Sequence, residues 1–282
     1  MLKIVLAEAS ERLLRAGVDA PRLSAQLLAC RVLHCSRLEL ELRADTEFSL
    51  QEAAAFAQLL GRRSLGEPVA RILGEREFYG RAFAVSSATL VPRPETELVA
   101  ELALARLPAA ELAFADLGTG TGCLGVSLCA ERPAWKAVLA DICAVALRTS
   151  VGNAVRHGVE KRILAVQGDF CVPLFQAGSL DCIVSNPPYI SEAEYRMLSP
   201  EVRDFDPRCA LVPGPSGLEH IRALAVRAAE ALRPGGLLLM ELGAEQGRAV
   251  EDIFCAGADW ADIRIHKDWA GLDRCLEARR KL

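Results

Sequence analysis

The sequence predicts an α/β protein in which a small N-terminal helical domain precedes a doubly wound, mostly parallel sheet. Three observations predict this class. Apolar residues recur at helical spacing from Ile4 to Leu60, strand and helix patterns alternate from Glu111 onward, and a glycine-rich loop, Gly118–Gly125, follows the first of these strands. Alternation of this kind is typical of a parallel sheet that is covered by helices on both faces.

Length and composition restrict the class of protein further. The chain has 282 residues, ten cysteines, four histidines and a formal net charge of -4. The acidic balance argues against a protein that coats nucleic acid, because such proteins carry a basic excess. The cysteines include no C-x-x-C pair and no zinc-ligand spacing, so we expect free thiols in a reducing compartment and no metal site. No apolar run approaches the length of about 20 residues that spans a membrane, and the first residues lack a signal-peptide core. We therefore expect a cytoplasmic protein without membrane association.

The segment up to Arg63 predicts three helices. Each candidate helix combines an apolar stripe at helical spacing with a start or stop signal. The signals are Gly17 at the end of the first helix, Asp19 and Pro21 at the start of the second, and a capping box of Ser49 and Glu52 before the third. A helical domain ahead of a complete cofactor-binding fold is expected to recognise a large partner.

A β-hairpin is expected within Glu77–Val85, where aromatic and β-branched residues flank Gly80. The block V-P-R-P-E-T-E, Val91–Glu97, then leads into a helix that runs to about Arg106. These patterns divide the chain into three parts. Residues 1–72 form a helical recognition domain, residues 73–92 a hairpin linker, and residues 93–282 a catalytic domain.

Seven candidate strands, separated by helical patterns, make up the last part. The strands are expected at Ala113–Leu117, Ala137–Asp141, Ile163–Gln167, Cys182–Ser185, Leu237–Glu241, Asp262–His266 and Cys275–Arg279. The helices are expected at Cys123–Arg132, Ala144–His157, Leu218–Leu232 and Gln246–Phe254. Ligands of such sheets bind at the carboxyl ends of the strands, so the residues that follow the strands are the candidate site.

The loop after the first strand, A-D-L-G-T-G-T-G-C-L-G, matches the G-x-G-x-x-G pattern at Gly120, Gly122 and Gly125. Glycines at these positions let a ligand approach the backbone. By itself the pattern fits an NAD enzyme as well as a methyltransferase, since Asp141 at the end of the second strand can hold ribose hydroxyls in both. Asp116 favours the methyltransferase, because its carboxylate repels a pyrophosphate. It suits S-adenosyl-L-methionine, which carries an ammonium and a sulfonium and no phosphate.

A ring follows the third strand. Phe170 comes directly after Asp169 at the carboxyl end of Ile163–Gln167. Its side chain can lie against an adenine or belong to the core, and the sequence leaves both alternatives open.

The segment N-P-P-Y, Asn186–Tyr189, follows the fourth strand. Each proline has a fixed φ and no N–H, so the strand stops at a rigid corner beside the glycine loop. A planar NH₂ group is a weak nucleophile because its lone pair is delocalised, and two acceptors for its hydrogens would localise and aim that pair. The Asn186 side-chain oxygen and the Pro187 carbonyl oxygen can be those acceptors, while Tyr189 offers a flat surface. The corner therefore predicts methyl transfer to a planar amide or base, without a histidine or a carboxylate pair.

The chain resembles the HemK family, the protein-(glutamine-N5) methyltransferases that modify the Gly-Gly-Gln loop of peptide-chain release factors. The matching motifs cover nearly the whole chain: G-E-P-V-A-R-I-L-G-E-R-E-F-Y-G, L-V-P-R-P-E-T-E, D-L-G-T-G-T-G, S-N-P-P-Y-I, A-L-V-P-G-P-S-G-L and R-P-G-G. N-P-P-Y alone is shared with adenine-N6 methyltransferases of nucleic acids, whereas V-P-R-P-E-T-E is more specific to this family. Two positions depart from the family pattern, Phe170 where many relatives carry Trp and Asp206-Pro207 where E-P is common.

The resemblance implies a seven-stranded, Rossmann-like class I methyltransferase sheet that ends in a hairpin. It also implies transfer of a methyl group from S-adenosyl-L-methionine to the glutamine of release factors, which would be the partners, with no nucleic acid bound. The cofactor-binding residues would be Asp116, Gly118, Thr119, Gly120, Thr121, Gly122, Asp141, Phe170 and Asn186. The substrate-binding residues would be Asn186, Pro187, Pro188 and Tyr189, of which Asn186, Pro187 and Tyr189 would be catalytic. Arg93, Thr96 and Glu97 are expected near the site without assigned roles, and a monomer is the working expectation.

Two other functions remain open at this point. An N6-adenine methyltransferase acting on nucleic acid would present the same planar NH₂ to the same corner. Against it, Met1–Ala88 has twelve basic and eleven acidic residues, a net charge of +1 that makes a poor phosphate-binding surface. A catalytically silent binding module is disfavoured by the presence of both the glycine loop and N-P-P-Y.

Overall fold

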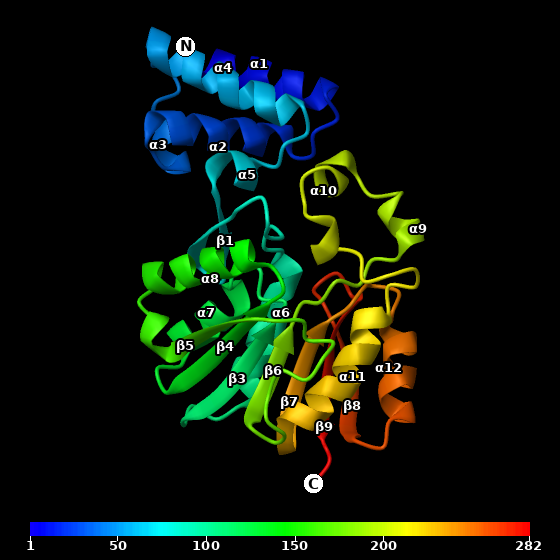
Figure 1. Ribbon diagram of the computed structural model, residues 1–282. Coiled ribbons are helices and arrows are strands. Elements are labelled where there is room, and N and C mark those ends of the chain that lie inside the picture. Colours follow the sequence, from blue (N-terminus) through cyan, green and yellow to red (C-terminus); the bar gives the residue numbers. More distant parts are fainter. The chain divides into compact units, whose positions relative to one another are not determined.

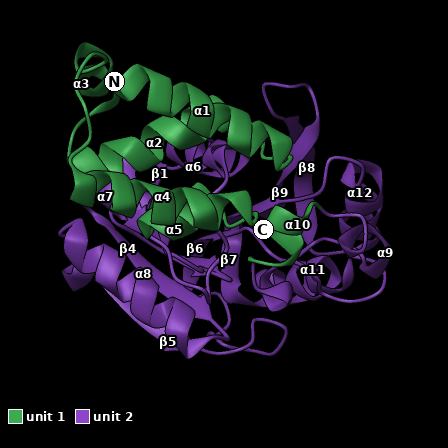
Figure 2. Ribbon diagram, turned by 90° about the horizontal axis from the view of Figure 1, so that it is seen from above, with its two compact units in different colours: residues 1–75, 199–205 green, residues 76–198, 206–282 purple.

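The computed structural model describes residues 1–282, which form two compact units (Figures 1 and 2). One unit comprises Met1–Glu75 with Ser199–Phe205, and the other comprises Arg76–Leu198 with Asp206–Leu282. The boundary between the units falls within the expected linker, residues 73–92, and most of that linker belongs to the second unit. Residues 199–205, far along the sequence, belong to the first. None of the helices combines the length and the apolar character that a membrane crossing requires.

The first unit is helical. Its helices are α1 (Leu2–Arg15), α2 (Pro21–Leu33), α3 (Arg37–Leu42), α4 (Leu50–Ser64), α5 (Val69–Leu73) and α10 (Pro200–Arg203). Leu13, Leu28 and Phe56 are buried where α1, α2 and α4 pack together. The α10 segment belongs to this unit through Arg63, which is 3% exposed and donates from Nη2 to Glu201 Oε2 at 2.7 Å.

Sequence signals located α1, α2 and α4 but not α3, α5 and α10, and one predicted start signal is wrong. The capping box of Ser49 and Glu52 at the start of α4 is confirmed. The prediction that Asp19 caps α2 is wrong, because Ala20 holds the N-cap position in the left-handed conformation, at φ 47°, without a side-chain cap. Helix α3 was not predicted, although Ser36 and Glu39 form a second capping box at its start.

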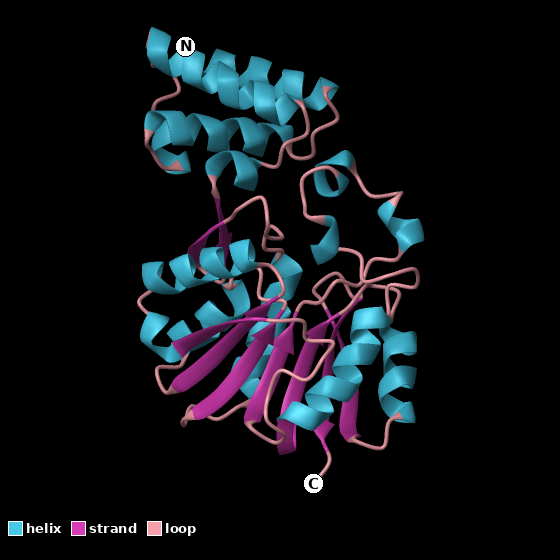
Figure 3. Cartoon of the chain, in the orientation of Figure 1, coloured by secondary structure: helices cyan, strands magenta, loops and turns pink.

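The second unit is built on the predicted seven-stranded sheet (Figure 3). Its strands are β3 (Leu112–Leu117), β4 (Trp135–Asp141), β5 (Ile163–Gln167), β6 (Leu180–Ser185), β7 (Leu232–Glu241), β8 (Trp260–Lys267) and β9 (Asp273–Arg280). They lie in the order β5-β4-β3-β6-β7-β9-β8, and β9 is antiparallel to both of its neighbours. Each predicted strand is confirmed, and β1 (Glu75–Phe78) with β2 (Arg81–Ala84) forms the predicted hairpin.

Helices cover both faces of this sheet, as predicted. The remaining helical segments are η1 (Pro94–Thr96), α6 (Glu97–Arg106), α7 (Cys123–Glu131), α8 (Ala144–Arg156), η2 (Glu160–Arg162), α9 (Glu192–Tyr195), η3 (Arg208–Ala210), α11 (Glu219–Ala231) and α12 (Gly247–Ala256). Successive side chains of a strand face opposite sides, so Phe114 of β3 packs with α6, α7 and α8. Its neighbour Ala115 packs with α11 and α12. The two faces together bury most residues of the central strands β3 and β6.

The register of the parallel strands brings four chain segments to one edge of the sheet. Leu117 of β3 pairs with Ala140 of β4 and with Ser185 of β6, and Ser185 pairs with Met240 of β7. The chain crosses from β3 to β4 in one direction and later returns to β6 on the other side. This switch point is where doubly wound sheets bind ligands, and the segments after β3, β4, β6 and β7 meet there.

Tight packing between α7 and the sheet gives a first prediction. A Cβ atom on Gly125 would lie 2.3 Å from Leu139 Cδ2 and 3.1 Å from Asp116 Oδ2. We expect Gly125→Ala to lower the free energy of unfolding by about 1–3 kcal/mol through overpacking. Gly152 in α8 is the matched control, since no atom lies within 4 Å of its Cβ position. Gly152→Ala should raise stability by up to about 1 kcal/mol. Urea unfolding followed by circular dichroism measures both, and an unchanged Gly125→Ala variant would contradict the close packing.

Candidate active site

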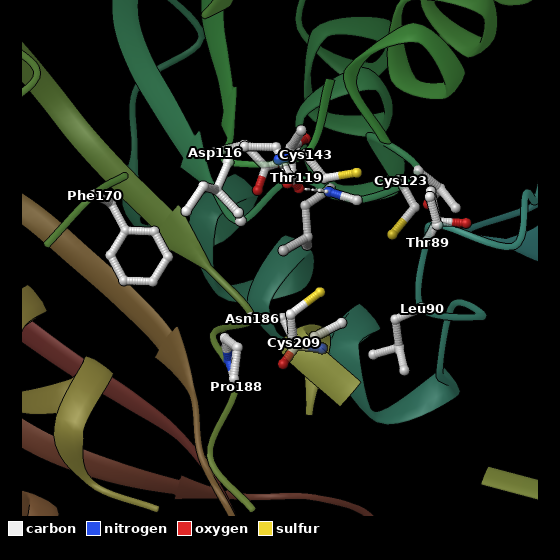
Figure 4. A pocket seen from close by; sticks show the side chains of 18 of the residues that line it. Thr89, Leu90, Asp116, Thr119, Cys123, Cys143, Phe170, Asn186, Pro188 and Cys209 are labelled. Carbon is white, nitrogen blue, oxygen red and sulfur yellow. Dashed lines mark hydrogen bonds between the residues drawn. The ribbon is translucent and has the colours of Figure 1, made fainter. Parts of the chain in front are cut away.

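A cavity lies at the carboxyl edge of the sheet in the second unit (Figure 4). The space between its lining residues, including the part open to solvent at its mouth, is about 1030 Å³. Nine of the twelve predicted site residues line it: Asp116, Gly118, Thr119, Gly120, Thr121, Asp141, Phe170, Asn186 and Pro188. Gly122, Pro187 and Tyr189 lie outside the lining. Figure 4 shows the side chains of Asp116 and Thr119 on one side of the cavity and those of Asn186 and Pro188 on another.

The backbone amides of the glycine loop are already hydrogen-bonded within the protein. The bonds run from the N–H groups of Gly118 and Thr119 to Ala140 O (2.9 and 3.0 Å), from Gly120 to Asp141 Oδ2 (2.9 Å) and from Gly122 to Thr119 O (2.8 Å). Dinucleotide-binding loops use such amides to hold a pyrophosphate. The loop therefore forms a wall that offers few donors to a phosphate.

The charges around the cavity also disfavour a phosphate-containing ligand. Arg93 is the only lysine or arginine in the lining, and its Nη2 donates to Asp206 Oδ2 at 2.9 Å. The loop side of the cavity instead carries the carboxylates of Asp116 and Asp141. This arrangement suits a cationic ligand and disfavours a polyphosphate.

Asp116 holds the glycine loop together. The side chain is 1% exposed, and its Oδ2 accepts hydrogen bonds from Thr119 Oγ1 at 2.7 Å and from the Gly125 N–H at 3.0 Å. Burial raises the pKa of Asp116 to about 6, against the opposing effect of these two bonds. The sequence predicted a charge facing a ligand, and the structure adds a bracing role within the loop.

Asp141 likewise holds backbone amides and lines the cavity. Its Oδ1 accepts from the Cys143 N–H at 2.8 Å and its Oδ2 from the Gly120 N–H at 2.9 Å. Burial raises the pKa of Asp141, and these two bonds oppose the rise. A carboxylate oxygen has two lone pairs, so each oxygen can still accept one hydroxyl from a ligand in the cavity.

The ring of Phe170 serves both purposes that the sequence left open. It packs partly against the core beneath α11 and also lines the cavity. Its edge-to-face partner is His220 on α11, with ring centroids 5.2 Å apart. Burial lowers the pKa of His220, which favours a neutral ring. Sequence reasoning missed this lining residue, since His220 is fifty positions away and matches no motif.

The N-P-P-Y corner rests on a buried hydrogen-bond network. Asn186 Nδ2 donates to Thr96 Oγ1 at 3.0 Å, and Thr96 Oγ1 donates to Glu241 Oε2 at 2.5 Å. The Tyr189 hydroxyl donates to Glu241 Oε1 at 3.0 Å. Thr96 and Glu241 are 2% and 1% exposed. No group of the chain donates to Asn186 Oδ1 or to the Pro187 carbonyl oxygen, so both acceptors are free.

Further contacts hold the backbone of this corner. Gln246 Nε2 donates to the Tyr189 carbonyl oxygen at 2.8 Å, and the Gly243 N–H holds the same Gln246 side chain at 2.9 Å. Gly217 lies directly against the corner at a positive φ of 76°, where an added Cβ would be 2.5 Å from the Tyr189 oxygen. The two free acceptors are therefore presented by a rigid backbone.

The V-P-R-P-E-T-E block contributes more to the site than the sequence indicated. Thr96 supports Asn186, and Arg93 pairs with the buried Asp206. Glu97 Oε1 accepts from the N–H of Tyr79 at 2.8 Å and so holds the turn of the hairpin, where Tyr79 has a φ of 49°. The three residues that lacked roles thus join the block to three separate segments.

Comparison with known proteins agrees with the family resemblance found in the sequence. The family model described as PrmC N-terminal domain matches residues 5–74, and the methyltransferase small domain matches residues 94–199. A release factor glutamine methyltransferase of Nitratidesulfovibrio vulgaris is 49% identical over 100% of this chain and 96% of its own. The chain belongs to the release factor glutamine methyltransferase family. A second family member, from Chlorobaculum tepidum, is 41% identical over 98% of this chain and 95% of its own.

Among solved structures, the crystal structure of a possible exported protein from Bordetella parapertussis is similar over 100% of this chain and 96% of that one. Its TM-score is 0.51 at 16% identity, which concerns the fold alone. The family resemblance read from the motifs and the seven-stranded methyltransferase sheet that it implied are both confirmed.

The network around Glu241 gives a second prediction. Tyr189→Phe keeps the flat ring but removes one of the two hydroxyls that bond to the buried carboxylate. We expect the free energy of unfolding to fall by about 1–3 kcal/mol, the cost of leaving a buried charged group short of a partner. Thermal and urea unfolding of the parent and the variant measure this loss. Equal stability of the two proteins would show that the hydroxyl does not bond to Glu241 in solution.

Proposed function

We propose that this chain transfers a methyl group from S-adenosyl-L-methionine to the side-chain amide nitrogen of glutamine in the Gly-Gly-Gln motif of peptide-chain release factors. One observation carries the proposal: Asn186 Oδ1 and the Pro187 carbonyl oxygen are free acceptors at the edge of a cavity whose carboxylates suit a cation. Membership of the release factor glutamine methyltransferase family supports the choice of substrate.

The residues of the cavity fit S-adenosyl-L-methionine, which supplies a methyl group on a positively charged sulfur. Asp141 keeps one free lone pair on each oxygen for the ribose hydroxyls. Phe170 offers a ring for the adenine, and Asp116 supplies negative charge for the ammonium group. The hydrogen-bonded amides of the loop explain why a pyrophosphate-containing cofactor fits less well.

The N-P-P-Y corner performs the positioning that the reaction needs. Asn186 Oδ1 and the Pro187 carbonyl oxygen accept the two hydrogens of the glutamine NH₂, which concentrates electron density on nitrogen and aims its lone pair. Pro188 keeps the second acceptor rigid, and Tyr189, which lies outside the cavity lining, supports the corner through its hydroxyl on Glu241. Glu241 is 1% exposed and does not line the cavity, so we assign it no role as a base. The nitrogen takes the methyl group from the sulfonium, which becomes a neutral thioether, and then gives its extra proton to solvent water.

Partner and compartment follow from this function. We place the protein in the cytoplasm with release factors as partners, and all ten of its cysteines are free thiols, as a reducing compartment requires. The helical first unit is the proposed docking surface for the body of the release factor. The working state is a monomer, which ultracentrifugation tests.

Methyl transfer from labelled cofactor tests the proposed function directly. Purified release factor, a short Gly-Gly-Gln peptide and adenine-containing DNA and RNA are offered side by side, and the product is mapped by mass spectrometry. We expect label on the glutamine of the release factor and slower labelling of the peptide, which lacks the docking contacts. Methylated adenine with unmodified glutamine would overturn the proposal in favour of the nucleic-acid enzyme.

Cofactor binding gives a third prediction. Asp141→Ala should weaken binding of S-adenosyl-L-methionine by on the order of 1–3 kcal/mol. Asp141→Asn keeps an acceptor oxygen and the shape, so its loss should be smaller. Because the carboxylate also holds two backbone amides, unfolding curves must accompany the calorimetry. Unchanged affinity would remove Asp141 from the site, and tight binding of NADH by the parent would overturn the cofactor assignment.

The reacting corner gives a fourth prediction. Asn186→Ala should lower kcat by about 10²–10³, the typical cost of losing one oriented partner of a reacting group, while cofactor affinity stays within about twofold. Asn186→Asp should also be slow. Its second oxygen would face Thr96 Oγ1, whose single proton is already given to Glu241. Single-turnover kinetics with release factor measures both variants, and a loss confined to KM would contradict the assigned role.

A further inference from the structure

We propose that Thr96 is a positioning residue for methyl transfer, and that it acts by fixing which end of the Asn186 amide faces the substrate. The inference deepens the proposed function and rests on it. It concerns a block, V-P-R-P-E-T-E, of which Pro92, Arg93 and Thr96 line the cavity and to which the proposed function gives no role in the reaction.

The two ends of an asparagine amide have the same shape and opposite hydrogen-bonding character. One end is an acceptor oxygen and the other a donor NH₂. If Asn186 turned by 180° about its terminal bond, it would present two donors to the substrate NH₂ in place of an acceptor. The reaction therefore needs a second group that decides between the two orientations.

The single hydroxyl proton of Thr96 determines which orientation of the Asn186 amide is favoured. Thr96 Oγ1 lies 2.5 Å from Glu241 Oε2, a length typical of a hydroxyl bonded to a carboxylate oxygen. With its proton given to Glu241, Thr96 can only accept a hydrogen bond on the side of Asn186. The atom of Asn186 that lies 3.0 Å away must therefore be the NH₂ nitrogen. Asn186 Oδ1 is left free for the substrate.

Glu241 keeps the hydroxyl of Thr96 pointing in this direction. Each of its oxygens accepts one hydroxyl, from Thr96 and from Tyr189, so neither oxygen offers a proton to Thr96. Burial raises the pKa of Glu241, and the hydroxyls of Thr96 and Tyr189 together with the positive charge of Arg274 on β9 oppose this rise. Because Glu241 accepts from Thr96, Thr96 accepts from Asn186, and the carboxylate thereby sets the direction of both hydrogen bonds.

The decisive experiment is a double-mutant cycle on methylation of intact release factor. Thr96→Val and Thr96→Ser are each made in the parent and in the Asn186→Ala background, and kcat, KM and cofactor Kd are measured. Valine removes the hydroxyl at nearly constant volume, and serine restores it. A residue that acts only through Asn186 should matter only when Asn186 is present.

We expect Thr96→Val to lower kcat by about 10²-fold, the scale for misplacing a reacting group by about 1 Å. KM and cofactor Kd should stay within about twofold, and Thr96→Ser should retain most of the parental kcat. In the Asn186→Ala background Thr96→Val should cause no further loss. A multiplicative loss in that background, or an equal loss in Thr96→Ser, would overturn the proposal and leave Thr96 a packing residue.

Two further arms keep the test decisive. If the valine variant does not fold, Thr96→Cys replaces it, because a thiol is a weaker donor and acceptor and should give a smaller loss with the same non-additivity. If the parent methylates adenine and not glutamine, the proposed function fails, and the cycle is measured on the adenine substrate. That substrate presents the same planar NH₂, so the role of Thr96 is decided separately.

Discussion

The N-P-P-Y corner depends on one buried carboxylate. Glu241 ends strand β7 beneath the N-P-P-Y segment and receives hydroxyls from Thr96 and Tyr189, two residues on different chain segments. Burying a carboxylate is costly unless hydrogen bonds compensate it, and here the compensating bonds are those that organise the site. Glu241 at the end of β7 thereby determines which way the hydroxyl of Thr96 points. That hydroxyl in turn determines which end of the Asn186 amide faces it, at the end of the neighbouring strand β6.

A related principle shapes the cofactor side of the cavity. Asp116 and Asp141 accept backbone amides and a hydroxyl of the glycine loop, which holds the loop in place without help from a ligand. These bonds, together with backbone bonds to the carbonyl oxygens of Ala140 and Thr119, occupy amides that a pyrophosphate would need, and the two carboxylates leave negative charge at the wall. The carboxylates of Asp116 and Asp141 therefore contribute both to the structure of the glycine loop and to the negative charge that suits a cationic ligand. A glycine pattern shared with NAD enzymes can serve a cationic cofactor when acidic residues take up its amides.

The parts of the structure that depend on local sequence were predictable, and those that depend on distant pairs were not. The alternation of strands and helices located every strand of the sheet, and N-P-P-Y with the glycine loop located two walls of the cavity. Thr96 and Glu241 are 145 positions apart, and neither residue type signals the bond between them. The same holds for His220 beside Phe170 and for Glu201 beside Arg63. The wrong cap at Asp19 has a local cause, because Ala20 takes a left-handed conformation that side-chain preferences do not anticipate.

The most direct measurement is a crystal structure of the protein with S-adenosyl-L-homocysteine and a Gly-Gly-Gln peptide from a release factor. The account predicts that the side-chain nitrogen of the peptide glutamine lies within hydrogen-bond distance of both Asn186 Oδ1 and the Pro187 carbonyl oxygen. It also predicts that Asn186 Nδ2 still faces Thr96. A glutamine nitrogen that contacts neither acceptor, or an Asn186 amide whose oxygen faces Thr96, would contradict it.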